Sequence, residues 1–259
     1  MATVDQPEIH PLYSPGEETN PPLASYLITC GAKTVLIDPG PAWHLRRHLQ
    51  ALEERVTRDR SLLVVIQSPL PATLSALAML EGLTKKRTVV VHWKVAALAT
   101  HDLASWKRQE LTTRGGSVTL SPSSRLLFGI TPSGGMPGAL MSFEGNSGTL
   151  FSGPFFGSLG TGQDTGKPAL RRESVRAYRD VFTPNTDEQI VSEAFGSEPA
   201  INQIAPSYGR LAVGGISLIK ALFKDEHHDD PFEAALSRLY VRTAALVGVD
   251  AATGIFRAG

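Results

Sequence analysis

Cysteine, net charge and long apolar runs are what this chain has least of. Its one cysteine, Cys30, cannot form an internal disulfide and indicates a reducing compartment. Lysine plus arginine and aspartate plus glutamate number 25 each, so no net charge attracts nucleic acid or anionic lipid. No apolar run approaches the ~18 residues of a membrane span, and the first residues lack a secretory signal pattern. We therefore predict a cytoplasmic protein without nucleic-acid or membrane partners.

The composition is otherwise that of a globular protein. Of the 259 residues, 42% are apolar and 19% are charged, which is ordinary for a globular domain. The length fits one large domain with a tail. We place that domain at residues 1–223. Residues 224–259 follow as a charged linker, Lys224–Asp230, and a C-terminal helix.

Strand and helix patterns alternate along the chain. Leu23–Thr29 and Lys33–Asp38 are β-rich runs joined by a short turn with glycine, which predicts a hairpin. Leu62–Ile66 is a continuous apolar run, typical of a strand covered on both faces. Pro7–Pro22 is rich in proline, glycine and glutamate, and we predict that it is irregular. The other predicted strands are 88–92, 125–129, 138–143, 149–152 and 203–205, and the predicted helices are 43–55, 72–83, 93–100, 169–182, 211–223 and 231–247.

The order of these elements predicts the fold class. Strands and helices alternate in two halves, and each half begins with antiparallel pairs. We therefore predict an α/β protein, an αββα sandwich of two sheets with helices outside.

Four separated segments resemble one known family. They are Ala24–Ile28 with Thr34–Gly40, the turn Ser68–Leu77, Thr131–Gly157, and Ile204-Ala205-Pro206-Ser207-Tyr208-Gly209. In that order and at that spacing they resemble the lactamase-like domain of flavodiiron and related oxygen-binding diiron proteins, within the metallo-β-lactamase superfamily. The resemblance covers about residues 8 to 212 and implies the metallo-β-lactamase fold.

The family's metal ligands are absent from the matching positions. Where the family carries the H-x-[HE]-x-D-H motif and its later ligands, this chain carries other residues. These replaced-ligand positions are Ser68, Leu70, Ala72, Thr73, Gly135, Pro154 and Tyr208. A diiron site needs imidazole nitrogens and carboxylate oxygens, and only neutral hydroxyls remain here. We predict that the chain binds no metal and no cofactor, and that these positions line a candidate pocket.

Loss of the metal also removes the family's chemistry. Hydrolysis in this fold relies on a metal to acidify water and polarise the substrate. Ser68, Thr73 and Tyr208 offer hydroxyls, but no histidine base stands among the replaced-ligand positions. We therefore predict a non-catalytic protein. A metal-independent hydrolase using Ser68 and Tyr208 is the alternative, and a structural dimer scaffold is a third interpretation.

Histidines elsewhere have plainer interpretations. His44 and His48 have the i, i+4 spacing of a metal-binding pair, but two arginines lie between them and a solvated helix face is favoured. His227-His228-Asp229-Asp230 is rich in metal ligands but lies in the charged linker, so we interpret it as an exposed connector.

The C-terminal segment indicates a signalling role. Asp250–Arg257 partly resembles the D-x-L-T-G-L-x-N-R segment that begins diguanylate cyclase domains, with Ala252 and Arg257 departing from it. An apolar helix before such a segment would pair with its twin in a dimer. We predict a homodimeric sensory or regulatory module. The resemblance implies the sensor part of a cyclic-di-nucleotide signalling protein, whose output domain would either follow residue 259 or have been lost.

Overall fold

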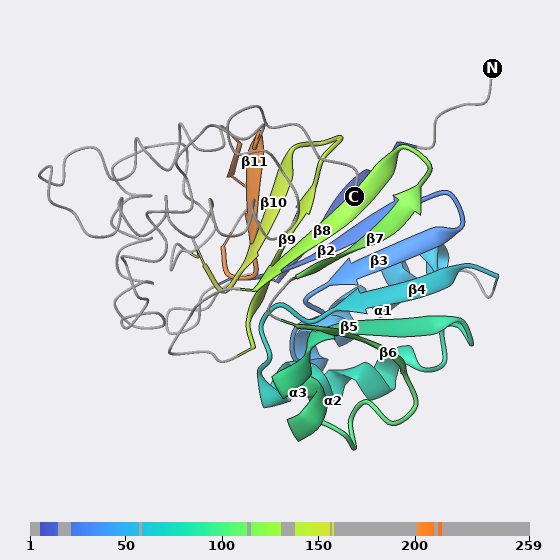
Figure 1. The fold of residues 1–259 in the computed structure, drawn as a ribbon. Helices are drawn as coiled ribbons and strands as arrows, with labels where there is room; N and C mark the ends of the chain where they lie inside the picture. Colours follow the sequence, from blue (N-terminus) through green and yellow to red (C-terminus); the bar gives the residue numbers. More distant parts are fainter. Residues whose placement is uncertain are drawn as a thin grey trace, which may run out of the picture.

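Two mixed β-sheets lie face to face (Figure 1). The computed structural model describes residues 6–14, 22–56, 59–112, 115–130, 138–155, 157, 201–209 and 212–213. The first sheet has the order β1 (Glu8–Ser14), β2 (Leu23–Cys30), β3 (Lys33–Ile37), β4 (Ser61–Val65), β5 (Arg87–His92) and β6 (Lys107–Leu111). The second has the order β12 (Ala212–Val213), β11 (Gln203–Pro206), β10 (Thr149–Gly153), β9 (Leu140–Glu144), β8 (Ser124–Ile130) and β7 (Gly116–Ser121).

Helices connect the parallel strands of the first sheet. β1, β2 and β3 are antiparallel neighbours, and β3, β4, β5 and β6 are parallel neighbours. The crossovers carry α1 (Ala42–Arg55), then α2 (Pro71–Ser75) with the 3₁₀ helix η1 (Ala76–Leu80), then α3 (Trp93–Leu98). Parallel strands need such crossovers, and their carboxyl ends lie at one edge of the sheet. We call this the C-terminal edge; the segments that follow β3, β4 and β5 begin there.

Two hydrophobic clusters set the layers. One lies between α1–α3 and the first sheet, and includes Leu45 and Leu77. The other lies between the two sheets, where the Tyr26 and Phe151 rings meet edge to face with centroids 5.4 Å apart. The described residues therefore form a helical layer, a sheet and a second sheet.

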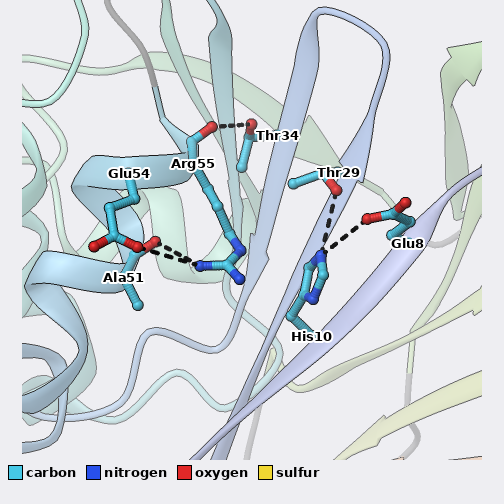
Figure 2. Close-up of polar contacts among 7 residues, drawn as sticks. All are labelled: Glu8, His10, Thr29, Thr34, Ala51, Glu54 and Arg55. Carbon is cyan, nitrogen blue, oxygen red and sulfur yellow. Dashed lines mark hydrogen bonds and ion pairs between the residues drawn. The ribbon is translucent and has the colours of Figure 1, made fainter.

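Side-chain contacts fix the edge strand and the end of α1 (Figure 2). Across β1 and β2, the His10 Nε2 lies 3.5 Å from Thr29 Oγ1 and 3.5 Å from Glu8 Oε2. On β3, which pairs with β2, Thr34 Oγ1 donates to the carbonyl of Arg55 at 3.4 Å. That contact ties β3 to the last residue of α1.

The structure corrects several predicted elements. Pro7–Pro22 is not irregular throughout, because Glu8–Ser14 forms β1. Pro11 hid this strand, but proline is tolerated in an edge strand, where β1 lies. The predicted helix 72–83 is instead α2 followed by η1, and the predicted helix 211–223 is wrong at its start, because Ala212 and Val213 pair with β11. The sequence also did not predict the polar edge strand β6.

Other predictions lie outside the described residues. They include helices 169–182 and 231–247, and the proposed boundary at residue 223. Within the described residues, no helix is long and apolar enough to cross a membrane.

Candidate functional site

The C-terminal edge brings together the segments that carry the replaced-ligand positions. The turn after β4 receives a hydrogen bond from the second sheet, Leu140 N to Gln67 O at 3.0 Å. Ser207 N donates to Gly153 O at 2.8 Å, and the Ser207 Oγ lies 3.5 Å from Ser68 Oγ. The chain segments of Ser68, Pro154 and Tyr208 therefore converge at this edge.

The replaced-ligand positions differ in how deeply they lie. Ser68 and Thr73 are each 3% exposed and Pro154 is buried. Leu70 and Tyr208 are half-buried, and Ala72 is exposed on α2. Gly135 lies outside the described residues.

The centre of this region is a carboxylate that is not among the predicted site residues. Asp38 follows β3 directly, is buried, and has a left-handed backbone with φ of 47°. Its Oδ1 accepts from the backbone N–H groups of Gln67 at 2.7 Å and Ser68 at 2.9 Å. Its Oδ2 accepts from Ser68 Oγ at 2.7 Å and from Ser207 Oγ. Asp38 thus joins the turn after β4 in the first sheet to the segment after β11 in the second.

Hydrogen bonds stabilise the charge of this carboxylate. Within the described residues, no cationic side chain forms an ion pair with it. Burial raises the pKa of the Asp38 carboxyl, and hydrogen bonds from Ser207, Ser68 and Gln67 oppose that rise. Each carboxylate oxygen already accepts two donors, which matches its hydrogen-bonding capacity. Asp38 is therefore a cross-link between loops, with no acceptor site left for a further partner.

A second polar chain leads from Asp38 to the edge strand. Ser25 Oγ donates to the Asp38 carbonyl, so its only proton is used and it must accept from His44 Nε2, 2.9 Å away. In a neutral imidazole Nδ1 then accepts, and Ser14 Oγ lies 2.7 Å from it. His44 is 1% exposed, and burial together with His48 and Arg47 lowers its pKa to about 3. His44 is therefore a neutral, buried link between α1, β1 and β2.

This overturns the interpretation of His44 and His48 as a solvated helix face. Strand β1 contacts the first turns of α1, and its residues lie in the segment that we predicted to be irregular. His48 is half-buried, and its backbone partner is Tyr13 of β1. The two rings lie 4.9 Å apart, but both His44 nitrogens are hydrogen-bonded to serines. The pair is therefore structural and does not chelate.

Gln67 and Gly153 hold the two sheets together beneath Ser68. Gln67 Nε2 donates to Ser142 Oγ and to Phe151 O, both at 2.9 Å. Gly153 has φ of 61°, and a Cβ there would lie 2.9 Å from Leu140 O and 3.1 Å from Gln67 Cβ. Only glycine fits this backbone approach.

The residues that the structure describes at this edge do not fit a diiron centre. Among the described residues, no group of three or more histidine, cysteine, aspartate or glutamate side chains could hold a metal ion. The hydroxyls of Ser68 and Ser207 and the Asp38 carboxylate are bonded to one another. Two dications would lack the charged donors that compensate them.

The hydroxyls are also poorly arranged for nucleophilic catalysis. Ser68 directs its proton into Asp38, and no imidazole hydrogen-bonds to it in the part of the chain that the structure describes. Burial and the Asp38 charge raise the pKa of Tyr208 to about 12, so the phenol stays neutral at pH 7. Among the described residues, Ser68 therefore has no imidazole base of the kind that activates a serine nucleophile.

Comparison with known proteins assigns the family. The model of the family described as ODP family beta lactamase matches residues 22–189. The chain belongs to this family. No curated protein matches the chain.

Solved structures with the same fold include a flavodiiron core, a diflavin flavoprotein fragment and a chemotaxis sensor. A metal-soaked flavodiiron core from Synechocystis is 21% identical with a TM-score of 0.70. It aligns with 84% of this chain, which spans only 58% of that core. A diflavin flavoprotein fragment from Nostoc is 18% identical with a TM-score of 0.70, covering 93% of this chain and 94% of that one. The apo chemotaxis sensor ODP from T. denticola is 17% identical with a TM-score of 0.66, covering 83% and 92%. This ODP-family chain therefore has the predicted αββα metallo-β-lactamase fold.

The sequence did contain a signal for the Asp38 cross-link. Asp38-Pro39-Gly40 follows a buried strand, and a carboxylate in such a turn lies at the carboxyl edge. The serine partners had no such signal, because Ser207 is distant in sequence and serine is common in turns.

Proposed function

We propose that this ODP-family chain is a metal-free, non-catalytic module with a sensory or regulatory role. The observation that carries the proposal is the Asp38 cross-link. It holds the loops of the C-terminal edge together through hydroxyl and amide donors, where the diiron family would place metal ligands. A preformed edge without metal supports binding of a ligand or partner in place of catalysis.

Two resemblances support the regulatory role. One of the similar structures is the chemotaxis sensor ODP of T. denticola, at 17% identity. The C-terminal Asp250–Arg257 also resembles the start of diguanylate cyclase domains. We propose that the module acts as a homodimer and passes its signal through the segment 231–247, which the sequence predicts to be helical, to an output domain.

A metal-independent hydrolase is the less favoured function. It would need an accessible, activated Ser68, but that residue is 3% exposed and donates to Asp38. Assays against ester and phosphoester substrates, with metal chelated, test this alternative. Turnover that disappears in Ser68→Ala would favour it over the regulatory module.

Metal content tests the leading proposal. Protein expressed untagged in medium supplemented with iron and zinc is analysed by inductively coupled plasma mass spectrometry. We expect far less than one metal per chain, and no rise in Tm on adding Fe²⁺ or Zn²⁺, since a metal bound only to the native state raises stability.

A variant separates the linker from the site. Metal removed by His227→Gln with His228→Gln belongs to the charged linker and leaves the proposal intact. Metal near two equivalents that survives this double substitution would contradict the proposal, because the edge would then hold a dinuclear centre. Sedimentation velocity tests the homodimer in the same preparation.

A further inference from the structure

Exposed apolar side chains gather on the helical layer of the first sheet. Trp43 is 50% exposed, Trp93 is 43% and Leu98 is 89%; these are the large hydrophobic side chains exposed among the described residues. Single exposed apolar residues are ordinary on protein surfaces. Here all three lie on α1 and α3, and none lies on the second sheet.

Both tryptophans stand at the C-terminal edge. Trp43 is the second residue of α1, which follows β3, and Trp93 begins α3 directly after β5. Because β4 lies between β3 and β5, helix α2 begins between the two tryptophans. α1 contacts α2, and α2 and α3 pack in one hydrophobic cluster on the same face of the sheet (Figure 1). The exposed residues of α2 are Pro71, Ala72 and Ser75, all uncharged.

The charges on the first turns of α1 and on α3 have one sign. Arg46 and Arg47 are exposed on α1, and Lys94 is exposed on α3 with its Nζ 5.8 Å from the centroid of the Trp93 ring. α2 and α3 contain no carboxylate, and α1 has none before Glu53. Ten residues of helix separate Trp43 from Glu53, about 15 Å along the axis. The first carboxylate beyond α3 is the exposed Asp102, past its end.

We propose that this surface binds an acidic segment of a partner protein that also carries apolar side chains. We call it the Trp43–Trp93 surface; it comprises Trp43, Arg46, Arg47, Pro71, Ala72, Trp93, Lys94 and Leu98. Tryptophan and arginine are the side chains that contribute most at protein interfaces. Cations beside them attract carboxylates and repel a basic partner. The proposal names a partner class for the regulatory module and rests on that role, but its test does not depend on metal content.

The same charges argue against the other occupants. A symmetric contact with a second copy places the same patch on both sides, so cation would face cation. Binding to an anionic membrane would be favoured by only about 1 kcal/mol for each of the three cations, Arg46, Arg47 and Lys94.

Peptide binding tests the proposal on the full chain. The probe is a synthetic peptide that alternates glutamate with leucine and phenylalanine; the control peptide carries lysine in place of glutamate. Neither absorbs in the tryptophan band, so a change in protein tryptophan emission reports binding. Trp106 is buried and gives a constant contribution. We expect saturable binding of the glutamate peptide alone, weakened by added salt.

Matched variants locate the binding site. Trp93→Ala and Lys94→Glu should each weaken the glutamate peptide at least about tenfold. Lys85→Glu reverses an exposed charge before β5, at the opposite edge of the sheet, and should change affinity less than about twofold. Unchanged circular dichroism and Tm show that the variants are folded.

Several results would overturn the proposal. They are the absence of saturable binding, equal binding of both peptides, or an equal loss with Lys85→Glu. Dissociation of a dimer by Trp93→Ala in sedimentation would assign the surface to a second copy. Binding to phosphatidylserine vesicles without peptide binding would assign it to a membrane. Each of these can occur with a metal-free site, so failure here is distinct from failure of the proposed function.

Discussion

Replacing Asp38 tests whether its carboxylate holds the C-terminal edge together. In Asp38→Ala the backbone N–H groups of Gln67 and Ser68 lose their acceptor, while both are buried. The Ser68 and Ser207 hydroxyls also lose theirs, but they lie 3.5 Å apart and can bond to each other. Each buried N–H without a partner costs about 1–3 kcal/mol.

Backbone conformation adds to that cost, and relief of burial offsets it. Asp38 has φ of 47°, a conformation that aspartate and asparagine tolerate and alanine adopts at a cost of about 1–2 kcal/mol. Removing the buried carboxylate charge also removes its unfavourable desolvation, which offsets part of the loss in the free energy of unfolding. We expect Asp38→Ala to lower the free energy of unfolding by about 3–5 kcal/mol.

Asp38→Asn is the matched control. Asparagine keeps an oxygen for the two N–H groups and tolerates the left-handed backbone, and its NH₂ can donate to the serine hydroxyls once they rotate. We expect its unfolding free energy to fall by no more than about 1 kcal/mol, because the lost charge also removes a desolvation cost. The pair of variants therefore separates acceptor geometry from charge.

Urea unfolding followed by circular dichroism measures both variants. An unchanged m-value is required, so that the midpoint reports stability alone. A cycle of Ser68→Ala, Ser207→Ala and the double variant should show a coupling of at least about 0.5 kcal/mol through the shared Oδ2. A fall in the unfolding free energy of Asp38→Ala of less than about 1 kcal/mol, or equal falls in the alanine and asparagine variants, would contradict the role of Asp38 as a cross-link.

Three further predictions follow from the same region. The pKa of His44 is lowered to about 3, so below pH 6.5 the unfolded state binds a proton that the native state does not. The free energy of unfolding should therefore fall by on the order of 4 kcal/mol between pH 6.5 and pH 3. Urea titrations of His44→Gln should show a shallower fall. Gly153→Ala should lower the unfolding free energy by about 2–4 kcal/mol in urea titration, because its Cβ meets the Leu140 carbonyl with a left-handed backbone, and a loss below about 1 kcal/mol would contradict this. The pKa of Tyr208 is raised to about 12, so the free energy of unfolding should fall as pH rises from 10 to 12, where the phenol ionises only in the unfolded state. Ultraviolet titration of the wild type, compared with Tyr208→Phe, should show the Tyr208 phenolate only near pH 12.

The strands buried on both faces were the most predictable part of the fold. The apolar run at Leu62–Ile66 and the hairpin around Gly31 have patterns that few other structures satisfy, and the structure contains both. Edge strands were less predictable. Glu8–Ser14 contains a proline and Lys107–Leu111 is mostly charged, so neither has the apolar pattern of a strand. Such residues are tolerated there because each strand lies at an edge of the sheet and pairs on one side only.

The chemistry of the candidate site was not predictable from the sequence. The resemblance grouped Ser68 and Tyr208 in one candidate pocket, and the structure brings their chain segments together through Ser207. It could not reveal that Asp38 joins the segments, since that role depends on three-dimensional distances. His44 was misjudged for the same reason. Its helix carries two exposed arginines, and only the position of β1 shows which face is covered.

The Asp38 cross-link separates the shape of this edge from what the edge presents to solvent. Its contacts use backbone amides and the short side chains of serine and aspartate, all lying close to the main chain. Leu70 and Ala72 stand outward of these contacts and contribute no polar atoms to them. We therefore expect that new side chains can be introduced at positions 70 and 72 while the loops keep their conformation. This edge would then serve as a scaffold for engineered binding residues.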